Sequence, residues 1–396
     1  MARHHTFLDR LLDLKPLAFS LCDATLGRTR FSRLATGFFP DFEWPDDARV
    51  IHDLQWKHRL FEPRHDEARA IVTQFNVDVP NPMETAGAPD MSRTMVAELA
   101  DVVIPGHTLT PASASSGKQI SLGQRGKARW AFAYPAPVAL KRIRISELCL
   151  AIPPLWHYTH LLTDVLMPIC EAVRVGAINE REGIVVVSRT NPPMLDAFVE
   201  GIGLLGIPVR HLKLESTQHV LAERYLYARS HCPNIERIFG VPEALPTAHA
   251  IFGGAYRDVP PPPPAARLYL RRRNHRLRAV AGEEEMIGYL EKAGFRVMEP
   301  NWSNHAEQIA ACAGADVIAA MHGAALANSL FCKPGATVVE IMAENARKTT
   351  VLHWAGEAGA KVVPLLGGPE GAKQSFAIEP RQMADAIIRA ADAAAA

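Results

Sequence analysis

From residue 268 onward, short apolar strands alternate regularly with helices, and this alternation limits the possible fold more than any other feature of the chain. Strands that alternate with helices form a parallel sheet with helices on both faces. The predicted strands are 268–271, 295–299, 316–321, 337–341 and 361–365, and the predicted helices are 283–293, 304–312, 324–331, 348–357 and 381–395. The sequence therefore predicts an α/β, doubly wound domain in this part of the chain.

A second unit of the same kind precedes it, with strand 184–188, helix 194–205 and strand 208–212. One strand–helix–strand unit implies parallel strands joined by a right-handed crossover. Between the two units stand five consecutive prolines, Pro260 to Pro264, which no helix or central strand accommodates. We therefore predict a GT-B-like arrangement, meaning two Rossmann-like domains with parallel sheets that face a central cleft. The predicted divisions are 1–258 with its readable core at about 150–258, a linker at 259–266, a domain at 267–380 and a C-terminal helix at 381–396, while residues 1–140 show no clear pattern.

Bulk composition narrows the partners of the protein. Its 396 residues suit two domains, and 43 basic against 42 acidic side chains give a formal charge of +1. Such a balance produces no global field that would attract nucleic acid, so an anionic ligand must be held by a local cluster. The six cysteines show no CxxC spacing and suit buried thiols in a reducing compartment. The beginning of the chain resembles neither a signal peptide nor a spanning helix, so a cytoplasmic protein with possible peripheral membrane contact is expected.

The motif from His322 to Asn328, with the sequence HGAALAN, follows a predicted strand and opens a predicted helix. Ligands of open α/β sheets bind at this end of the strands. The small residues Gly323 and Ala324 leave room for backbone N–H groups to approach a diphosphate, which a helix N-terminus favours. His322 could donate a hydrogen bond to a phosphate oxygen or stabilise a leaving group. The alternative is a sterically small turn with a structural histidine.

Basic residues follow the first strand of the same domain. Arg271, Arg272 and Arg273 come directly after an apolar strand, with Arg278 nearby, so at least one guanidinium should point across the strand tips and bind phosphate. Glu340 lies inside the apolar strand 337–341. A carboxylate there is costly unless it is paired, which favours a ribose-diol contact, with a buried salt bridge as the alternative.

The run from Trp156 to Asp164 in the first domain is the second candidate site. On a helix, His160 and Asp164 lie four residues apart on one face, with His157 one turn before His160. Such a pair could act as the general base that removes a proton from an attacking hydroxyl. A local hydrogen-bonded pair without catalytic function is the alternative.

Together these pieces resemble glycosyltransferase family 61, most specifically over residues 268–341. The motifs that carry the resemblance are Arg271-Arg272 with Arg278, Gly282-Glu283, Gly294-Phe295, Glu307-Gln308, HGAALAN, Pro334-Gly335 with Glu340, and the histidine–acid pair His160 and Asp164. The chain departs from the family pattern at Arg271, Gly282, Ala325, Ala327 and His157, where the family has serine, asparagine, glycine, threonine and asparagine.

The resemblance implies inverting transfer of a sugar from a nucleotide diphosphate, most simply a UDP-sugar, to a hydroxyl of a glycan or lipid-linked glycan in cell-surface polysaccharide synthesis. The implied base is Asp164, with His160 orienting it or taking its place, and His157 is a further donor or acceptor contact. The donor-binding residues implied are Arg271, Arg272, Arg278, His322, Gly323, Ala324, Asn328 and Glu340. The chain contains no Asp-x-Asp, so neither a divalent metal nor another cofactor is expected.

Two other classes use similar sheets. A NAD-dependent oxidoreductase or epimerase would need a Gly-x-Gly-x-x-Gly after the first strand of a unit, which neither unit has. A non-catalytic nucleotide-binding protein would keep the cleft and lose the base, and the presence of both His160 and Asp164 argues against it.

Overall fold

The computed structural model describes the greater part of the chain from residue 42 to residue 395. The described residues are 42–43, 46–57, 91–106, 109–115, 119–120, 141–153, 158–189, 193–215, 217–231, 242–260, 266–272, 279–301, 303–345 and 350–395. Residues up to 260 are called the first half below and residues from 266 onward the second half. Most of the predicted proline linker, residues 261–265, lies outside the described residues.

The second half is built on a five-stranded sheet whose neighbouring strands are all parallel. The order across the sheet is β12 (Arg296–Met298), β10 (Arg267–Leu270), β13 (Val317–Met321), β14 (Thr337–Ala343) and β15 (Lys361–Gly367). The chain goes from β10 outward to β12 and then crosses back to β13 on the other side. Strand order therefore reverses between β10 and β13, and such a reversal is where open α/β sheets bind their ligands.

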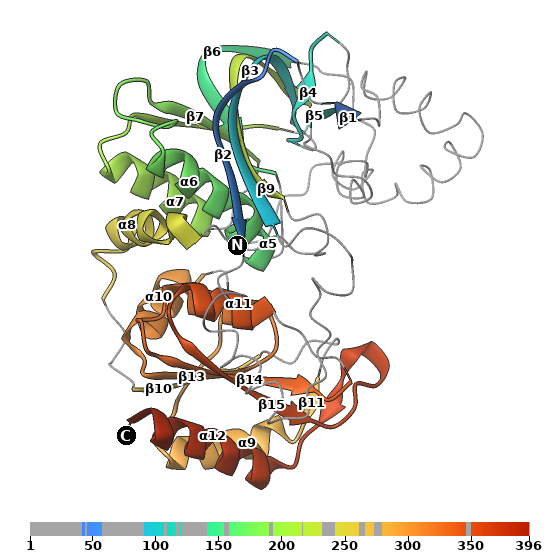
Figure 1. Cartoon of the computed structure of the whole chain (residues 1–396), viewed down its shortest axis with the longest axis vertical. Helices are drawn as coiled ribbons and strands as arrows, with labels where there is room; N and C mark the ends of the chain where they lie inside the picture. Colours follow the sequence, from blue (N-terminus) through green and yellow to red (C-terminus); the bar gives the residue numbers. More distant parts are fainter. Residues whose placement is uncertain are drawn as a thin grey trace, which may run out of the picture.

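Helices cover both faces of this sheet, as the alternation of strands and helices predicted. Figure 1 shows α9 (Glu283–Lys292) and α12 (Pro380–Ala395) on the side away from the first half, with α10 (His305–Gly314) and α11 (Thr350–Glu357) on the side toward it. Successive side chains of β10 serve the two faces, since Tyr269 is buried on the α9 side whereas Leu268 and Leu270 are buried on the other. A small pair of parallel strands, β11 (Val280–Ala281) and β16 (Phe376–Ala377), and a short turn of helix, η5 (Ala372–Gln374), complete this half.

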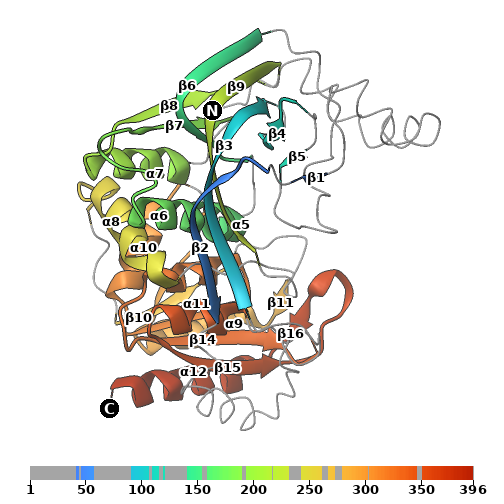
Figure 2. The same cartoon turned by 45° about the horizontal axis from the view of Figure 1, so that its top comes forward.

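The sheet of the first half is mixed, which corrects the prediction of a parallel Rossmann-like sheet. Four strands are parallel, in the order β8 (Val209–Lys213), β7 (Ile184–Ser188), β6 (Lys141–Ala151) and β9 (Gln218–His231). Strand β3 (Met91–Pro105) then pairs with β9 in the antiparallel sense, and β2 (Arg49–Lys57) does the same with β3. Figure 2 shows these long strands side by side. The remaining strands are β4 (Ala112–Ser113), β5 (Gln119–Ile120) and β1 (Phe42–Glu43). Apolar runs predict strands and not their direction, and the partners β3 and β9 lie far apart in the sequence.

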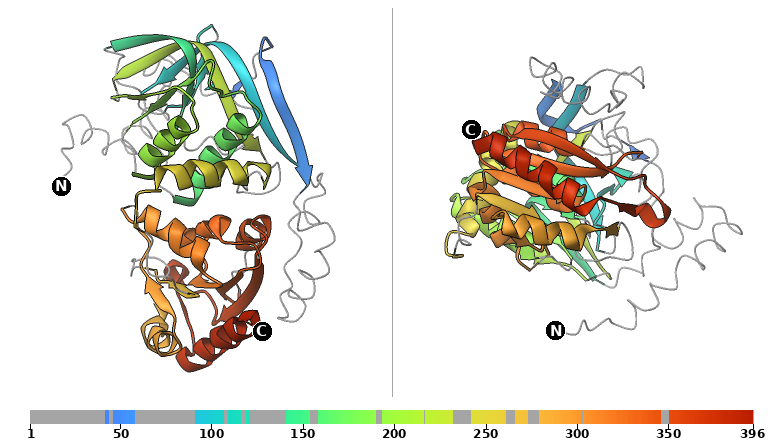
Figure 3. Two further views of the ribbon diagram at one scale, coloured as in Figure 1. Left: turned by 90° about the vertical axis from the view of Figure 1, so that its left-hand side faces the viewer. Right: turned by 90° about the horizontal axis from the view of Figure 1, so that it is seen from below.

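The helices of the first half lie against one face of its sheet and also meet the second half. They are α5 (Tyr158–His160), η2 (Leu161–Leu166), α6 (Met167–Arg174), α7 (Pro193–Leu204), η3 (Pro242–Ala244) and α8 (Leu245–Ala255). Helix α8 faces α10 of the second half (Figure 3). Phe252 on α8 meets Phe331 of the second half with ring centroids 5.6 Å apart, and one continuous apolar cluster contains residues of both halves. The two halves are therefore joined by a packed core.

Most predicted elements of residues 184–395 occur within one or two residues of their expected ends. The predicted helix 324–331 also has its expected ends, but it is a 3-10 helix, η4 (Ala324–Phe331), and not an α-helix. Its last six residues, Leu326 to Phe331, are all buried, so packing rather than helix propensity sets its pitch. Among the described residues, no helix has both the length and the apolar character that crossing a membrane requires.

Candidate functional site

The HGAALAN motif begins at the point where strand order reverses in the second sheet. β13 ends at Met321, and the backbone N–H of His322 still donates to the carbonyl of Ile341 on β14, at 2.8 Å. The position of His322 is thus set by the sheet. Gly323 then turns the chain into η4. The sequence correctly placed this motif at the carboxyl end of a strand.

Arg272 lies against this turn from the neighbouring strand β10. Its Nη1 lies 3.4 Å from the carbonyl oxygen of His322. A Cβ atom built on Gly323 would lie only 3.1 Å from Arg272 Nη2, so glycine permits this close approach. As expected from the sequence, one arginine points across the strand tips, and Arg272 and His322 follow the two strands, β10 and β13, that flank the reversal. A guanidinium here offers a planar set of donors that matches a phosphate.

Arg271 has a different orientation. Its Nη2 lies 2.5 Å from Glu284 Oε2 on the first turn of α9, at an exposed position. This pair turns the guanidinium toward the helix, so the structure brings Arg272 to the turn at Gly323 and pairs Arg271 with an acid instead. Arg278 and His157, both predicted as contacts, lie outside the described residues.

Glu340 forms a buried pair with His322. The carboxylate is 1% exposed, and its Oε1 lies 2.5 Å from His322 Nδ1. The sequence offered a ribose contact or a buried salt bridge for Glu340. The structure shows the second, because Oε1 of the carboxylate contacts the His322 imidazole. A carboxylate on Nδ1 fixes the ring and directs Nε2 away from the strand.

Asn328, predicted as a donor contact, is fully buried. Its Nδ2 donates to Gln308 Oε1 at 2.9 Å and to the Ala325 carbonyl at 3.0 Å, and its Oδ1 accepts from the hydroxyl of Tyr158 at 2.5 Å. We therefore correct its interpretation to a structural residue that joins the two halves. Ala324 is partly exposed at the start of η4, next to Gly323.

Glu283, which was named only as part of the Gly282-Glu283 motif, is a further residue of this region. It lies at the start of α9, where Tyr269 donates a hydrogen bond to its Oε1 at 2.7 Å. Burial raises the pKa of this carboxyl, opposed by the Tyr269 hydrogen bond, the charge of Arg271 and a hydrogen bond from the Arg272 backbone. Glu283 thus anchors the segment that carries both arginines. The preceding Gly282 has a φ of 92°, and a Cβ there would lie 2.8 Å from the Ile378 carbonyl oxygen, which explains the departure from the family's asparagine.

The second constellation, His160 with Asp164, is also brought together. His160 Nδ1 lies 2.7 Å from Asp164 Oδ2, and Asp164 Oδ1 accepts from the Thr163 hydroxyl at 2.6 Å. Both side chains are partly exposed. The helix is irregular here, since α5 passes into η2, a π-helical segment of six residues that contains Asp164. Short π-helical segments are uncommon and occur frequently at functional sites.

Hydrogen bonds connect the His160 helix to the HGAALAN motif. Tyr158, two residues before His160, bonds to Asn328 as described and also contacts His305 Nε2 at 2.9 Å. Tyr256, at the end of α8, bonds to the other ring nitrogen of His305 at 2.6 Å. Sequence reasoning missed Tyr158, Tyr256 and His305. A buried histidine in α10 carries no periodic signal, although Tyr158 stood within a run already singled out.

Among the described residues, no three or more histidine, cysteine, aspartate or glutamate side chains gather as a metal site would require. Metal independence itself stays a prediction. The two histidine–carboxylate pairs are local and lie in different halves.

Fold and site together define an α/β protein with an arginine and a histidine at a strand-order reversal of the second half and a histidine–aspartate pair in the first half. Residues 158–339 match the family described as Glycosyltransferase 61, so this region of the chain supports membership of glycosyltransferase family 61, and the family suggests glycosyltransferase activity. The match begins at Tyr158 and ends one residue before Glu340, so it spans both halves. No curated protein matches the chain.

Proposed function

We propose that the protein is an inverting, metal-independent glycosyltransferase of GT-B architecture that transfers a sugar from a nucleotide diphosphate, a UDP-sugar, to a hydroxyl of a glycan acceptor. The proposal depends above all on one observation, the packing of the Arg272 guanidinium on the His322–Gly323 turn at the strand-order reversal. In this proposal the second half forms the donor domain, the first half the acceptor domain, and residues 259–266 the linker between them.

The donor diphosphate would bind at the turn. The Arg272 guanidinium supplies donors there, and His322 donates from Nε2 in its imidazolium form, because its Nδ1–H is already given to the Glu340 carboxylate, which keeps the ring oriented. Preorganised donors of this kind stabilise the charge that develops on a leaving diphosphate. Positive and neutral donors would then serve where other transferases use a divalent cation.

The acceptor would be activated by the His160–Asp164 pair. The Asp164 carboxylate accepts from His160 Nδ1–H through Oδ2, which makes Nε2 the unprotonated nitrogen of the neutral ring. We therefore assign proton acceptance to His160 Nε2 and orientation to Asp164, which reverses the order assigned from the sequence. The acceptor oxygen attacks the anomeric carbon, its proton passes to Nε2, and the bond from that carbon to the diphosphate oxygen breaks with its electron pair on the leaving group.

The remaining parts of the proposal are the setting and the acceptor. A polysaccharide or lipid-linked glycan made at the inner face of a membrane is the acceptor we favour, with the enzyme cytoplasmic and attached peripherally. The NAD-dependent alternative is weakened because Arg271 and Arg272 occupy the turn after β10, where a glycine-rich loop would be needed.

The test is a screen of nucleotide sugars with purified protein, in which nucleotide release is measured with and without a glycan acceptor. We expect one donor to support release, and UDP to raise the melting temperature where NAD does not. Stabilisation by NAD and not by UDP would overturn the proposal.

Two pairs of variants assign the roles. His160→Ala should lower transfer about 100-fold or more while the UDP-induced thermal shift persists, and Asp164→Asn should lower transfer less. Arg272→Gln should remove the UDP-induced shift. Arg271→Gln is the matched control, because it removes the same charge one residue away where the guanidinium faces Glu284, and it should reduce the shift less. A His160→Ala enzyme with normal transfer would eliminate His160 as the base.

A further inference from the structure

A buried chain of hydrogen bonds crosses the junction between the two halves. It begins at Tyr256 on α8, passes through His305 on α10 to Tyr158 on α5, and continues to Asn328 on η4. His305 and Asn328 are at most 2% exposed. The series of hydrogen bonds continues from Asn328 to Gln308, whose Nε2 donates to the Asn301 carbonyl at 2.6 Å.

The hydrogen bonds of this chain permit a single arrangement of protons. Asn328 Nδ2 donates to two carbonyl oxygens, so its Oδ1 must accept the one proton of the Tyr158 hydroxyl. The Tyr158 oxygen is then the acceptor for His305 Nε2–H, which leaves Nδ1 to accept from Tyr256. His305 is therefore neutral, in agreement with the effect of burial, which lowers its pKa to about 3. Every member has partners, and such satisfied buried networks hold one arrangement of the groups around them.

These hydrogen bonds join the two groups that the proposed reaction needs, the helix of the His160–Asp164 pair and the motif of the Arg272–His322 turn. Tyr158 lies two residues before His160 in the same helix, and Asn328 lies in the motif that begins with His322. Helix α5 also packs directly on η4. The Tyr158–Asn328 bond thus connects the helix that carries the His160–Asp164 pair directly to the motif that begins at His322.

We propose that Tyr158 is a positioning residue of the transferase, which holds the His160–Asp164 pair at one fixed place relative to the donor turn through its bonds to Asn328 and His305. This inference rests on the proposed function. A misplacement of about 1 Å between reacting groups can reduce the rate roughly 100-fold, so loss of the Tyr158 hydroxyl should lower the rate of transfer. Asp164 lies in the π-helical segment after α5, and such segments interrupt α-helices frequently at functional sites.

The test compares Tyr158→Phe with Tyr256→Phe. Tyr158→Phe removes the partner of His305 Nε2 and the donor to Asn328 Oδ1, whereas Tyr256→Phe removes only the partner of His305 Nδ1, so both should destabilise the protein, Tyr158→Phe more strongly. Only Tyr158 lies on the His160 helix and bonds to Asn328. We expect Tyr158→Phe to lower kcat roughly 10- to 100-fold with the KM for the donor changed less than about threefold, and Tyr256→Phe to keep kcat within about threefold of the wild type.

Equal losses of kcat in the two variants would overturn the positioning role and leave a purely structural one. An unchanged kcat in Tyr158→Phe would overturn it as well. Amide hydrogen exchange gives a readout that is independent of turnover: Tyr158→Phe should accelerate exchange in both 158–166 and 324–331, whereas Tyr256→Phe should not couple these two segments.

Failure of this inference is distinguishable from failure of the proposed function. If the wild type transfers no sugar from any donor, the function fails, and the exchange experiment still decides whether Tyr158 couples the two segments. If the wild type transfers sugar and the two variants behave alike in both measurements, the function stands and the positioning role is wrong.

Discussion

His305 is a histidine kept neutral by its surroundings. Its ring lies among Phe252, Tyr256 and Tyr158, with edge-on contacts between ring centroids of 5.4 to 5.6 Å, and both nitrogens face tyrosine hydroxyls. None of these neighbours is a carboxylate, and burial lowers the pKa of His305 to about 3. Protonation would place an unpaired charge inside the junction, which is costly in a medium of low dielectric constant.

This histidine should make the stability of the protein depend on pH. Between pH 6.5 and about 3 the unfolded chain binds the proton of His305 and the folded chain does not, so the free energy of unfolding falls as the pH is lowered through this range. The contribution amounts to at most about 1.4 kcal/mol per pH unit. Urea denaturation at a series of pH values measures the slope. His305→Gln keeps a hydrogen-bonding side chain that does not titrate, and it should reduce the slope; identical slopes would contradict the assignment.

Single residues at the site differ in how far the sequence revealed them. Arg272 and His322 were identified because each directly follows a buried strand, and strand ends of a parallel sheet share one edge. Asn328 was misassigned because the HGAALAN sequence alone does not say whether the Asn328 side chain faces a ligand or the interior. Only the partners from α5 and α10 decide that it faces inward.

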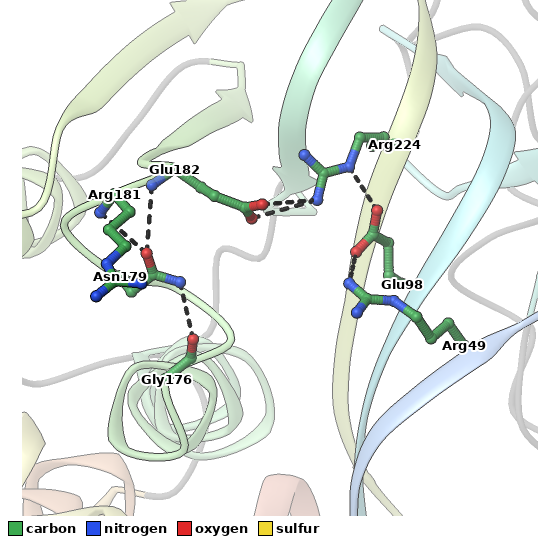
Figure 4. A network of polar contacts seen from close by, with 7 residues as sticks. All are labelled: Arg49, Glu98, Gly176, Asn179, Arg181, Glu182 and Arg224. Atoms are coloured by element: carbon green, nitrogen blue, oxygen red, sulfur yellow. Dashed lines mark hydrogen bonds and ion pairs between the residues drawn. The ribbon is translucent and has the colours of Figure 1, made fainter.

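At the level of strands, an ion network holds three members of the first sheet together. Figure 4 shows the Glu98 carboxylate of β3 between Arg49 of β2 and Arg224 of β9, and Arg224 also reaches Glu182 at 3.2 Å. The hydrogen bond from Arg224 is the main reason that the pKa of Glu98 lies below its usual range, with Arg49 adding to it. Such networks are stronger than isolated surface pairs, although they are screened by salt.

Glu98→Gln should therefore lower the free energy of unfolding by about 1 kcal/mol at pH 7 and low salt. Because the folded pKa of Glu98 is lowered, its contribution is present above the ordinary carboxyl pKa and is lost as the pH falls through the folded value. The difference between variant and wild type should shrink at low pH and in 1 M salt, as measured by urea denaturation. Glu223→Gln is the control, because its carboxylate contacts Arg144 at a longer 3.5 Å and is more exposed; an equal effect of both variants would contradict the network.

Helices and strands were predicted well where the spacing of apolar residues within the segment determines the element. The alternation of strands and helices after residue 266 follows from apolar spacing that each segment carries by itself. The pitch of η4 and the π-helical turn at Asp164 were not predicted, because both are set by what packs around them. The antiparallel partners β2 and β3 were missed for the same reason, since pairing with β9 joins segments more than a hundred residues apart.

The molecule as a whole is held together at the junction of its halves. Phe252 of α8 contacts Phe198 of α7 and Tyr256 in the first half, and Phe331 and His305 in the second. His249 of α8 also lies 2.9 Å from the Leu330 carbonyl through its Nε2. The core cluster thus passes from one sheet to the other.

We expect the two halves to unfold in one transition because they share this core. Circular dichroism and tryptophan fluorescence should give coincident denaturation curves, and Phe252→Ala should lower the free energy of unfolding by about 3–5 kcal/mol. Phe198→Ala removes a ring from the first half alone, so it should separate the two probes more than Phe252→Ala does. Two separate transitions in the wild type would show that the halves are independent.

The class of the second half, the position of the His322–Gly323 turn and the pairing of His160 with Asp164 could be derived from the sequence, because strand periodicity, strand ends and helical spacing are local properties of the chain. The mixed first sheet, the inward orientation of Asn328, the divergence of Arg271 from Arg272 and the Tyr158–His305 junction were decided only by tertiary structure. Each of these depends on contacts between segments distant in sequence, and the side chain alone does not encode which of its possible partners it will meet when the two halves pack.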